Sequence, residues 1–76
     1  MNNARRKSIN KIISDLAIVR NKVEEFRDEE TEAMNAIEER FGDTSRYDEM
    51  SEATYNLDAA LNSIEEAMIT LEDAIS

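Results

Sequence analysis

The chain contains no cysteine, histidine, proline or tryptophan, and it has a single glycine, Gly42. Without cysteine it can form neither a disulfide nor a thiolate metal site. Without histidine it lacks the commonest general base and the commonest metal ligand. The sequence also shows no nucleophile–base pair, glycine-rich phosphate loop or zinc-binding spacing. We therefore expect a protein that is not an enzyme and that binds no cofactor or metal.

The 76 residues form one small domain with a marginal core, because so short a chain buries only about 60–65% of its unfolded surface. Apolar residues make up 41% of the chain, which is too many for a simple disordered tail. The longest wholly apolar run is Leu16 to Val19, which predicts neither a membrane span nor a secretory signal. We expect a cytoplasmic protein that makes no contact with a membrane.

The net charge of −9 is unevenly placed along the chain. Residues 1–22 carry a balance of +5, and residues 23–76 carry a balance of −14. A field of this sign disfavours direct binding to nucleic acid or anionic lipid over most of the surface. It favours a protein partner whose own surface is basic or binds nucleic acid.

Residues 4–41 are predicted to form one helix and residues 46–74 a second, because nothing within either stretch breaks a helix. The turn is predicted at 42–45, where Gly-Asp-Thr-Ser is the only turn signal. Gly42 is expected to adopt the left-handed conformation that ends many helices. Residues 1–76 therefore indicate a single helical-hairpin domain.

Short polar side chains stand where each helix is expected to begin. Asn2 or Asn3 can cap the first helix, since an amide oxygen can accept a hydrogen bond from an unpaired backbone N–H. Ser45, with Asp48 three residues on, is a variant of the capping box and predicts the start of the second helix.

Both helices carry apolar residues at alternating steps of three and four, the spacing of a coiled-coil seam. In the second helix the seam is Tyr47, Met50, Thr54, Leu57, Leu61, Ile64, Met68, Leu71 and Ile75. In the first helix it is Ile9, Ile12, Leu16, Val19, Val23, Phe26, Glu30, Ala33, Ile37 and Arg40. The fold class predicted is all-α, an antiparallel two-helix hairpin.

Folding the chain back at residues 43–44 matches the two seams layer by layer. The apolar pairs are Ile12 with Ile75, Leu16 with Leu71, Val19 with Met68, Val23 with Ile64, Phe26 with Leu61, Ala33 with Thr54 and Ile37 with Met50. Glu30 falls opposite Leu57 and must be paired or hydrated there, so it is either a register marker or a functional residue. Flanking ion pairs are expected between Arg20 and Glu65 and between Arg27 and Asp58, with a role in register.

Alanine recurs every seven residues beside the seam of the second helix, at Ala53, Ala60, Ala67 and Ala74. This smooth flank would let another helix approach closely, although alanine is also simply the best helix former. Ile18, Tyr55 and Ile69 lie off the seam. We therefore expect an antiparallel four-helix homodimer, with the four alanines, Ile18 and Ile69 as its face.

Two charged segments are candidate contact surfaces. The acidic candidates, a row of carboxylates along a rod that resembles DNA phosphates, are Glu24, Glu25, Asp28, Glu29 and Glu32. The basic candidates are Arg5, Arg6, Lys7 and Lys11. Each set has a plainer interpretation, a solvated helix face for the acids and neutralisation of the acids at the end of the second helix for the bases. A di-iron site is disfavoured, because such sites also use a Glu-x-x-His motif.

Four stretches carry a resemblance to a group of known proteins. They are 3–7 (NARRK), 27–33 (RDEETEA), 56–60 (NLDAA) and 64–67 (IEEA). In them the chain resembles small acidic helical proteins encoded by bacteriophages and prophages of Gram-positive bacteria. It departs from that pattern at 41–44, which lacks a proline, and at Asn62, where an acidic residue is usual. The resemblance implies a host-takeover or anti-defence setting in the cytoplasm of the host cell.

Three functions are compatible with these features. The first is a protein-binding module that inhibits a host or defence protein through its acidic helical surface. The second is a structural or assembly hairpin that forms homo-oligomers. The third is a small regulatory protein that makes contacts through its basic N-terminal patch.

Overall fold

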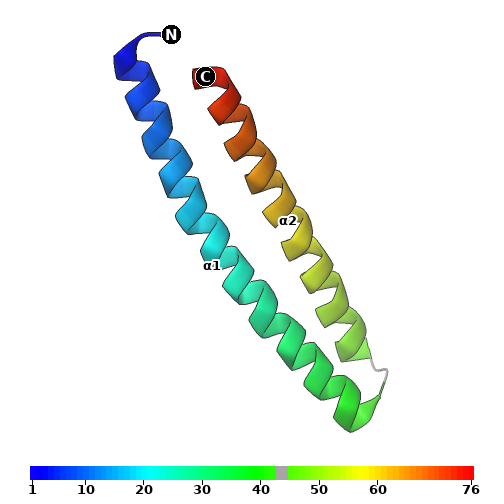
Figure 1. Cartoon of the computed structure of the whole chain (residues 1–76). Coiled ribbons are helices and arrows are strands. Elements are labelled where there is room, and N and C mark those ends of the chain that lie inside the picture. Colours follow the sequence, from blue (N-terminus) through cyan, green and yellow to red (C-terminus); the bar gives the residue numbers. More distant parts are fainter. Residues whose placement is uncertain (43–44) are drawn as a thin grey trace.

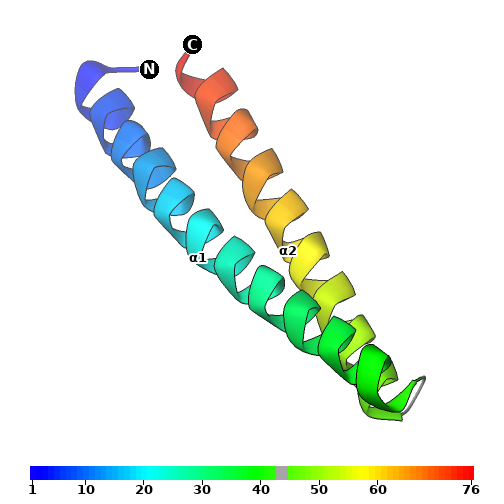
Figure 2. The same cartoon turned by 60° about the horizontal axis from the view of Figure 1, so that its bottom comes forward.

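The computed structural model describes residues 1–42 and 45–76, and it contains two long helices, α1 (Asn3–Phe41) and α2 (Ser45–Ile75). They run antiparallel and side by side, with both termini at the same end of the molecule (Figures 1 and 2). The predicted all-α helical hairpin is confirmed. Both helices begin one residue earlier than predicted, and α2 ends one residue later. Asp43 and Thr44 of the predicted turn lie outside the described residues.

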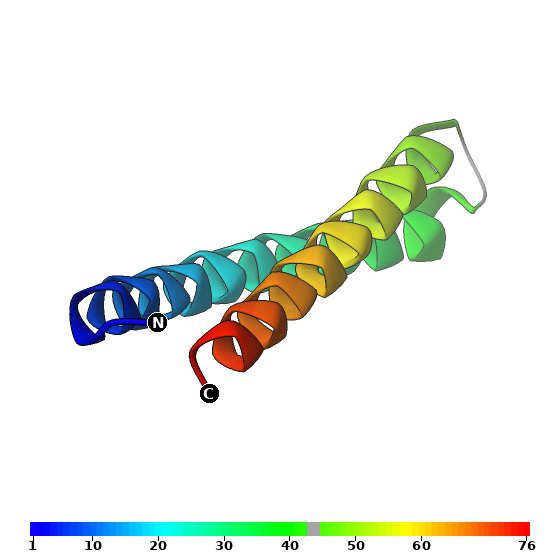
Figure 3. The ribbon, with the colours of Figure 1, turned by 90° about the horizontal axis from the view of Figure 1, so that it is seen from above.

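The hairpin is a thin rod of 58 × 15 × 12 Å. Its long dimension equals the length of α1, since 39 residues at about 1.5 Å each span about 58 Å. Seen from above, the two helices are inclined to one another (Figure 3). Such an inclination is typical of helices that pair along heptad seams. Among the described residues, no helix is both long enough and apolar enough to cross a membrane.

Asn2 caps α1. Its Oδ1 accepts a hydrogen bond from the backbone N–H of Arg5 at 2.8 Å, and its carbonyl accepts from the N–H of Arg6 at 3.1 Å. The side chain thereby satisfies one of the four unpaired donors at the start of the helix, and the bond to Arg6 is the first of the regular helical hydrogen bonds. Of the two asparagines that the sequence offered, the first is therefore the cap.

Gly42 ends α1 in a conformation that differs from the predicted one. Its φ of 72° is positive, as expected, but its ψ of −157° lies far from the left-handed helical region. Its N–H still donates to the carbonyl of Glu38 at 3.0 Å, so the last turn of the helix is closed. This combination of φ and ψ is essentially restricted to glycine, because a Cβ atom would strain the backbone.

Replacing Gly42 by alanine is expected to lower the free energy of unfolding by about 1–3 kcal/mol. The cost arises from backbone strain alone, because the space where the new Cβ would stand is open to 4 Å. Urea unfolding followed by circular dichroism measures it. Asn35→Ala, at an exposed position of α1, is the control and should change stability little or raise it. Equal stability of Gly42→Ala and the wild type would contradict the assigned conformation.

The seam predicted for α2 is confirmed. All nine of its positions are half-buried or buried, and Leu61, at 6% exposure, is the most deeply buried side chain among the described residues. Thr54 fits into this apolar row because its hydroxyl donates to the Met50 carbonyl at 2.9 Å, within its own helix.

The seam predicted for α1 is only half right. Ile9, Leu16, Val23, Glu30 and Ile37 are half-buried as expected. The alternate positions are exposed instead, with 47% for Ile12, 45% for Val19 and 61% for Phe26, although Ala33 is half-buried. Arg40 is also exposed. The residues that follow the predicted ones are half-buried in their place: Ile13, Arg20, Arg27 and Met34.

The difference is a rotation of α1 about its own axis. Phe26 and Arg27 lie on either side of Val23, since successive residues are about 100° apart around a helix. Only one of these two flanks can face a single neighbouring helix. The structure turns the Arg27 flank inward, where the aliphatic stem of arginine covers apolar surface and its guanidinium reaches α2.

Truncating Leu61 to alanine should destabilise the hairpin by about 2–5 kcal/mol, because it removes the best-buried side chain. Ile69→Ala is the matched control in the same helix. Ile69 is 58% exposed, and its truncation should change stability by less than about 0.5 kcal/mol. Both values come from chemical denaturation at constant protein concentration. Similar losses for the two variants would contradict the position of the seam.

Candidate functional site

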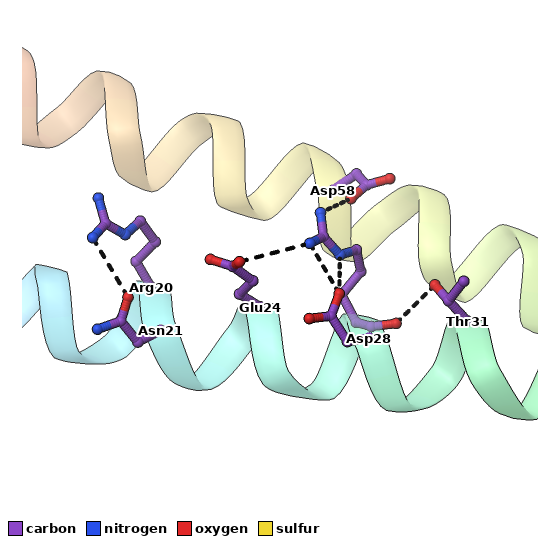
Figure 4. Close-up of polar contacts among 7 residues, drawn as sticks. Arg20, Asn21, Glu24, Asp28, Thr31 and Asp58 are labelled. Carbon is purple, nitrogen blue, oxygen red and sulfur yellow. Dashed lines mark hydrogen bonds and ion pairs between the residues drawn. The ribbon is translucent and has the colours of Figure 1, made fainter.

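Arg27 joins the two helices and also contacts three residues of its own helix. Figure 4 labels its partners Asp58 on α2 and Glu24 and Asp28 on α1. Its Nη1 atom lies 2.9 Å from Oδ1 of Asp58 on α2, and this ion pair confirms the predicted one. Its Nη2 atom lies 3.0 Å from Oδ1 of Asp28 and 4.0 Å from Oε1 of Glu24. The Arg27 carbonyl accepts from the hydroxyl of Thr31 at 2.9 Å. One cation thus organises three carboxylates.

These contacts raise the pKa of the Arg27 guanidinium above its usual value, first through the hydrogen bond to Asp58 and then through that to Asp28. A raised pKa in the folded state means that the pairing stabilises the fold fully below the ordinary pKa of arginine. That contribution would be lost only as the pH rises through the raised value. Arg27 therefore supports the hairpin throughout the neutral range of pH.

The other predicted ion pair is absent from the described residues. Arg20 is half-buried, and its Nη2 atom donates instead to Oδ1 of its neighbour Asn21 at 3.4 Å. Glu65 is exposed and makes no ion pair within residues 1–42 and 45–76. The helices are therefore joined by a charge contact at Arg27 and not at Arg20.

Asp58→Asn is expected to lower the urea midpoint, because it leaves the Arg27 guanidinium without its partner on α2. Glu65→Gln removes the same charge from the same helix and is the control. It should leave the midpoint nearly unchanged, since Glu65 is exposed and makes no ion pair within the described residues. The difference between the two variants should shrink in high salt. A larger loss for Glu65→Gln would contradict the observed pairing.

The acidic candidates form the outer surface of α1. Glu25 and Glu32 lie two turns apart, and each is about 200° around the axis from a residue of the seam. All five acidic candidates are exposed. Arg27 holds Glu24 and Asp28, whereas Glu25, Glu29 and Glu32 form no ion pair within the described part of the chain. A hollow of about 310 Å³ on this surface is lined by Asn21, Glu24, Glu25 and Asp28.

The four basic candidates lie in the first turns of α1 and are all exposed. Lys11 pairs with Asp15 one turn along, at 2.6 Å. Within the described residues, Arg5, Arg6 and Lys7 form no ion pair with the acids at the end of α2. The predicted neutralisation across the two helix ends therefore involves no direct salt bridge among the described residues and stays a prediction.

The candidates for a dimer face lie on different sides of the hairpin. Ile18 is about 200° around α1 from the half-buried Arg20, so it points away from α2. Ile69 is likewise about 200° around α2 from Ala67. Ala53 is half-buried, and Ala60, Ala67 and Ala74 are exposed on one flank of the seam. Ile18 and Ile69 therefore do not share a surface with the alanines.

Glu30 lies half-buried in the seam, as predicted, near the turn end of the rod. A hollow of about 290 Å³ there is lined by Glu30, Arg46, Glu49 and Met50. Arg27 turns to other carboxylates, so Glu30 has no ion pair among the described residues. Within the same residues, no group of three or more side chains is arranged to hold a metal ion.

The fold and its surfaces define a two-helix hairpin with an acidic outer surface and exposed apolar residues along its sides. A scan against protein-family models gives no match, and no significant match appears among curated proteins or solved structures. The function is therefore argued from the geometry of these surfaces.

Proposed function

We propose that the protein is a non-enzymatic binding module whose acidic outer surface on α1 captures a basic protein partner. The observation that carries this proposal is the set of exposed carboxylates Glu25, Glu29 and Glu32 on one helix, which form no ion pair within the described residues. Uncompensated charges of one sign on a rigid surface speed association with an oppositely charged partner and select for it.

The density of charge supports a partner that ordinarily binds nucleic acid. The five acidic candidates lie within about 12 Å of helix rise, whereas a DNA duplex of that length carries about seven phosphates. A surface of this kind competes for the basic groove of a nucleic-acid-binding protein. Together with the resemblance noted in the sequence, it favours an inhibitor of a host or defence protein, encoded by a phage and acting in the host cytoplasm.

Triple neutralisation of Glu25, Glu29 and Glu32 to glutamine should abolish capture of basic proteins from a bacterial lysate by the immobilised chain. The matched control is Glu52→Gln/Glu66→Gln/Asp73→Asn on α2, where all three residues are exposed and the change in net charge is the same. This control should retain capture, because it leaves the outer surface of α1 intact.

Two further measurements are competition by duplex DNA and the dependence of capture on salt concentration. Duplex DNA should displace the captured protein, and capture should fall steeply as the salt concentration rises from about 0.1 to 1 M, where the screening length drops from about 10 to 3 Å. Capture that survives both the triple neutralisation and high salt would contradict the proposal. Equal loss in the two triple variants would show that net charge acts, and not this surface.

The second candidate function is assembly, and it is favoured by the exposure of Ile12, Ile18, Val19, Phe26 and Ile69. A hairpin that self-associates would scaffold other subunits without an acidic contact. The basic patch is the third candidate. Binding of duplex DNA or of an anionic vesicle at low salt would support it, if that binding is lost when Arg5, Arg6 and Lys7 are neutralised.

A further inference from the structure

The rotation of α1 exposes a column of large apolar side chains that the sequence had placed in the seam. Ile12, Val19 and Phe26 recur every seven residues, so they lie along one line of the helix. Each is about half exposed or more. A row of such residues is uncommon on the surface of a monomer, and it marks a contact surface.

This column lies on the same side of the hairpin as the alanines of α2. On α1, Phe26 and Arg27 flank Val23 on opposite sides, and on α2, Ala60 and Asp58 flank Leu61 on opposite sides. Arg27 binds Asp58, so these two mark one side of the rod. Phe26 and Ala60 consequently mark the other. We call this other side the apolar edge, formed by Ile12, Val19, Phe26, Ala33, Ala53, Ala60, Ala67 and Ala74.

Across the apolar edge, each large residue of α1 lies at the same height along the rod as an alanine of α2. In the register set by the Arg27–Asp58 contact, Phe26 lies beside Ala60. One heptad away Val19 lies beside Ala67, and a further heptad away Ile12 lies beside Ala74. The edge is therefore ridged along α1 and smooth along α2. A two-fold axis parallel to the rod places the large residues of one copy against the alanines of a second copy, so the surface is complementary to itself.

Between Ala53 and Ala74 the α2 side of the apolar edge is free of charge. The next column outward from the alanines contains Asn56, Ser63 and Thr70 there, and Glu49 lies in the same column nearer the turn; 36% of the chain as a whole is charged. Depletion of charge is the compositional mark of the centre of a protein interface. On α1 the edge is bordered by the charged residues Asp15, Lys22 and Glu29, each one turn from a member of the apolar column.

The hairpin exposes more surface than a compact monomer of the same mass, and the excess is similar to the area that one partner buries in a dimer. A compact monomer of 8.7 kDa exposes about 4,700 Å², and the hairpin exposes 5686 Å². The excess of about 1,000 Å² is close to the area of about 800 Å² that each partner buries in a standard interface.

We propose that a second copy of the chain covers the apolar edge, giving a two-fold symmetric four-helix bundle in which the large residues of α1 pack against the alanines of α2 in the other copy. This inference concerns a surface other than the acidic one, and it holds whether or not that surface binds a partner. The acidic surface remains outward in the dimer, once on each side.

Sedimentation equilibrium between about 1 and 200 μM tests the proposal. The wild-type chain should show twice its mass of 8.7 kDa. Val19→Ser/Phe26→Ser should weaken dimerisation by about 100-fold or more, because four large apolar side chains leave the interface. The control Ile18→Ser/Ile69→Ser removes two equally exposed apolar side chains from other surfaces and should retain the dimer.

A single-chain mass for the wild type over the whole range would overturn the proposal, as would dissociation of the control variant alone. If Val19→Ser/Phe26→Ser loses its helical circular dichroism, the urea midpoint of the wild type decides. A midpoint that rises with protein concentration supports a dimer that stabilises the fold, and a constant midpoint overturns it. Failure of lysate capture by the acidic surface would leave each of these readings unchanged.

Discussion

The contact between Arg27 and Asp58 determines how the two helices face each other. It fixes the register of the hairpin, because it joins residues that lie 31 positions apart in the chain. It also fixes the rotation of α1, since the arginine can reach α2 only from the inner side of its helix. The exposed apolar edge follows from that rotation. The ion pair thus accompanies the arrangement that leaves this part of the hairpin exposed.

The sequence predicted the hairpin because its turn signal is confined to one place and the heptad spacing of α2 is unambiguous. Leu57, Leu61 and Ile64 have no competing column of large apolar residues beside them, so periodicity alone identified the buried face. The first helix carries an apolar column through Ile12, Val19 and Phe26, and beside it a mixed column of Ile13, Arg20, Arg27 and Met34. Periodicity favours the apolar column, whereas the structure turns the mixed column inward, where Arg27 reaches Asp58. Sequence reasoning had identified that ion pair but not its consequence for the rotation of α1.

The candidate surfaces were predicted unevenly for the same reason. The acidic residues lie opposite the seam whichever of the two columns faces inward, so their exposure could be expected. Which residues are available to form a dimer depends on the rotation of α1. The sequence shows which residues lie outside the seam, but not which side of the rod each of them occupies. Ile18 and Ile69 were grouped with the alanines because all are apolar, yet they occupy other sides of the rod. Phe26, the most exposed residue of its column, had been assigned to the core.

The thinness of the rod has its own consequence. With cross-sectional dimensions of only 15 × 12 Å, the hairpin has almost no interior, and Leu61, itself 6% exposed, is the one buried apolar residue among those described. Nearly every side chain is therefore available to a neighbour, and surfaces around the axis are separated by little more than one helix diameter. A molecule of this shape can sit between two others and touch both at the same level along its length. Its geometry allows different neighbours to bind its different sides independently of one another.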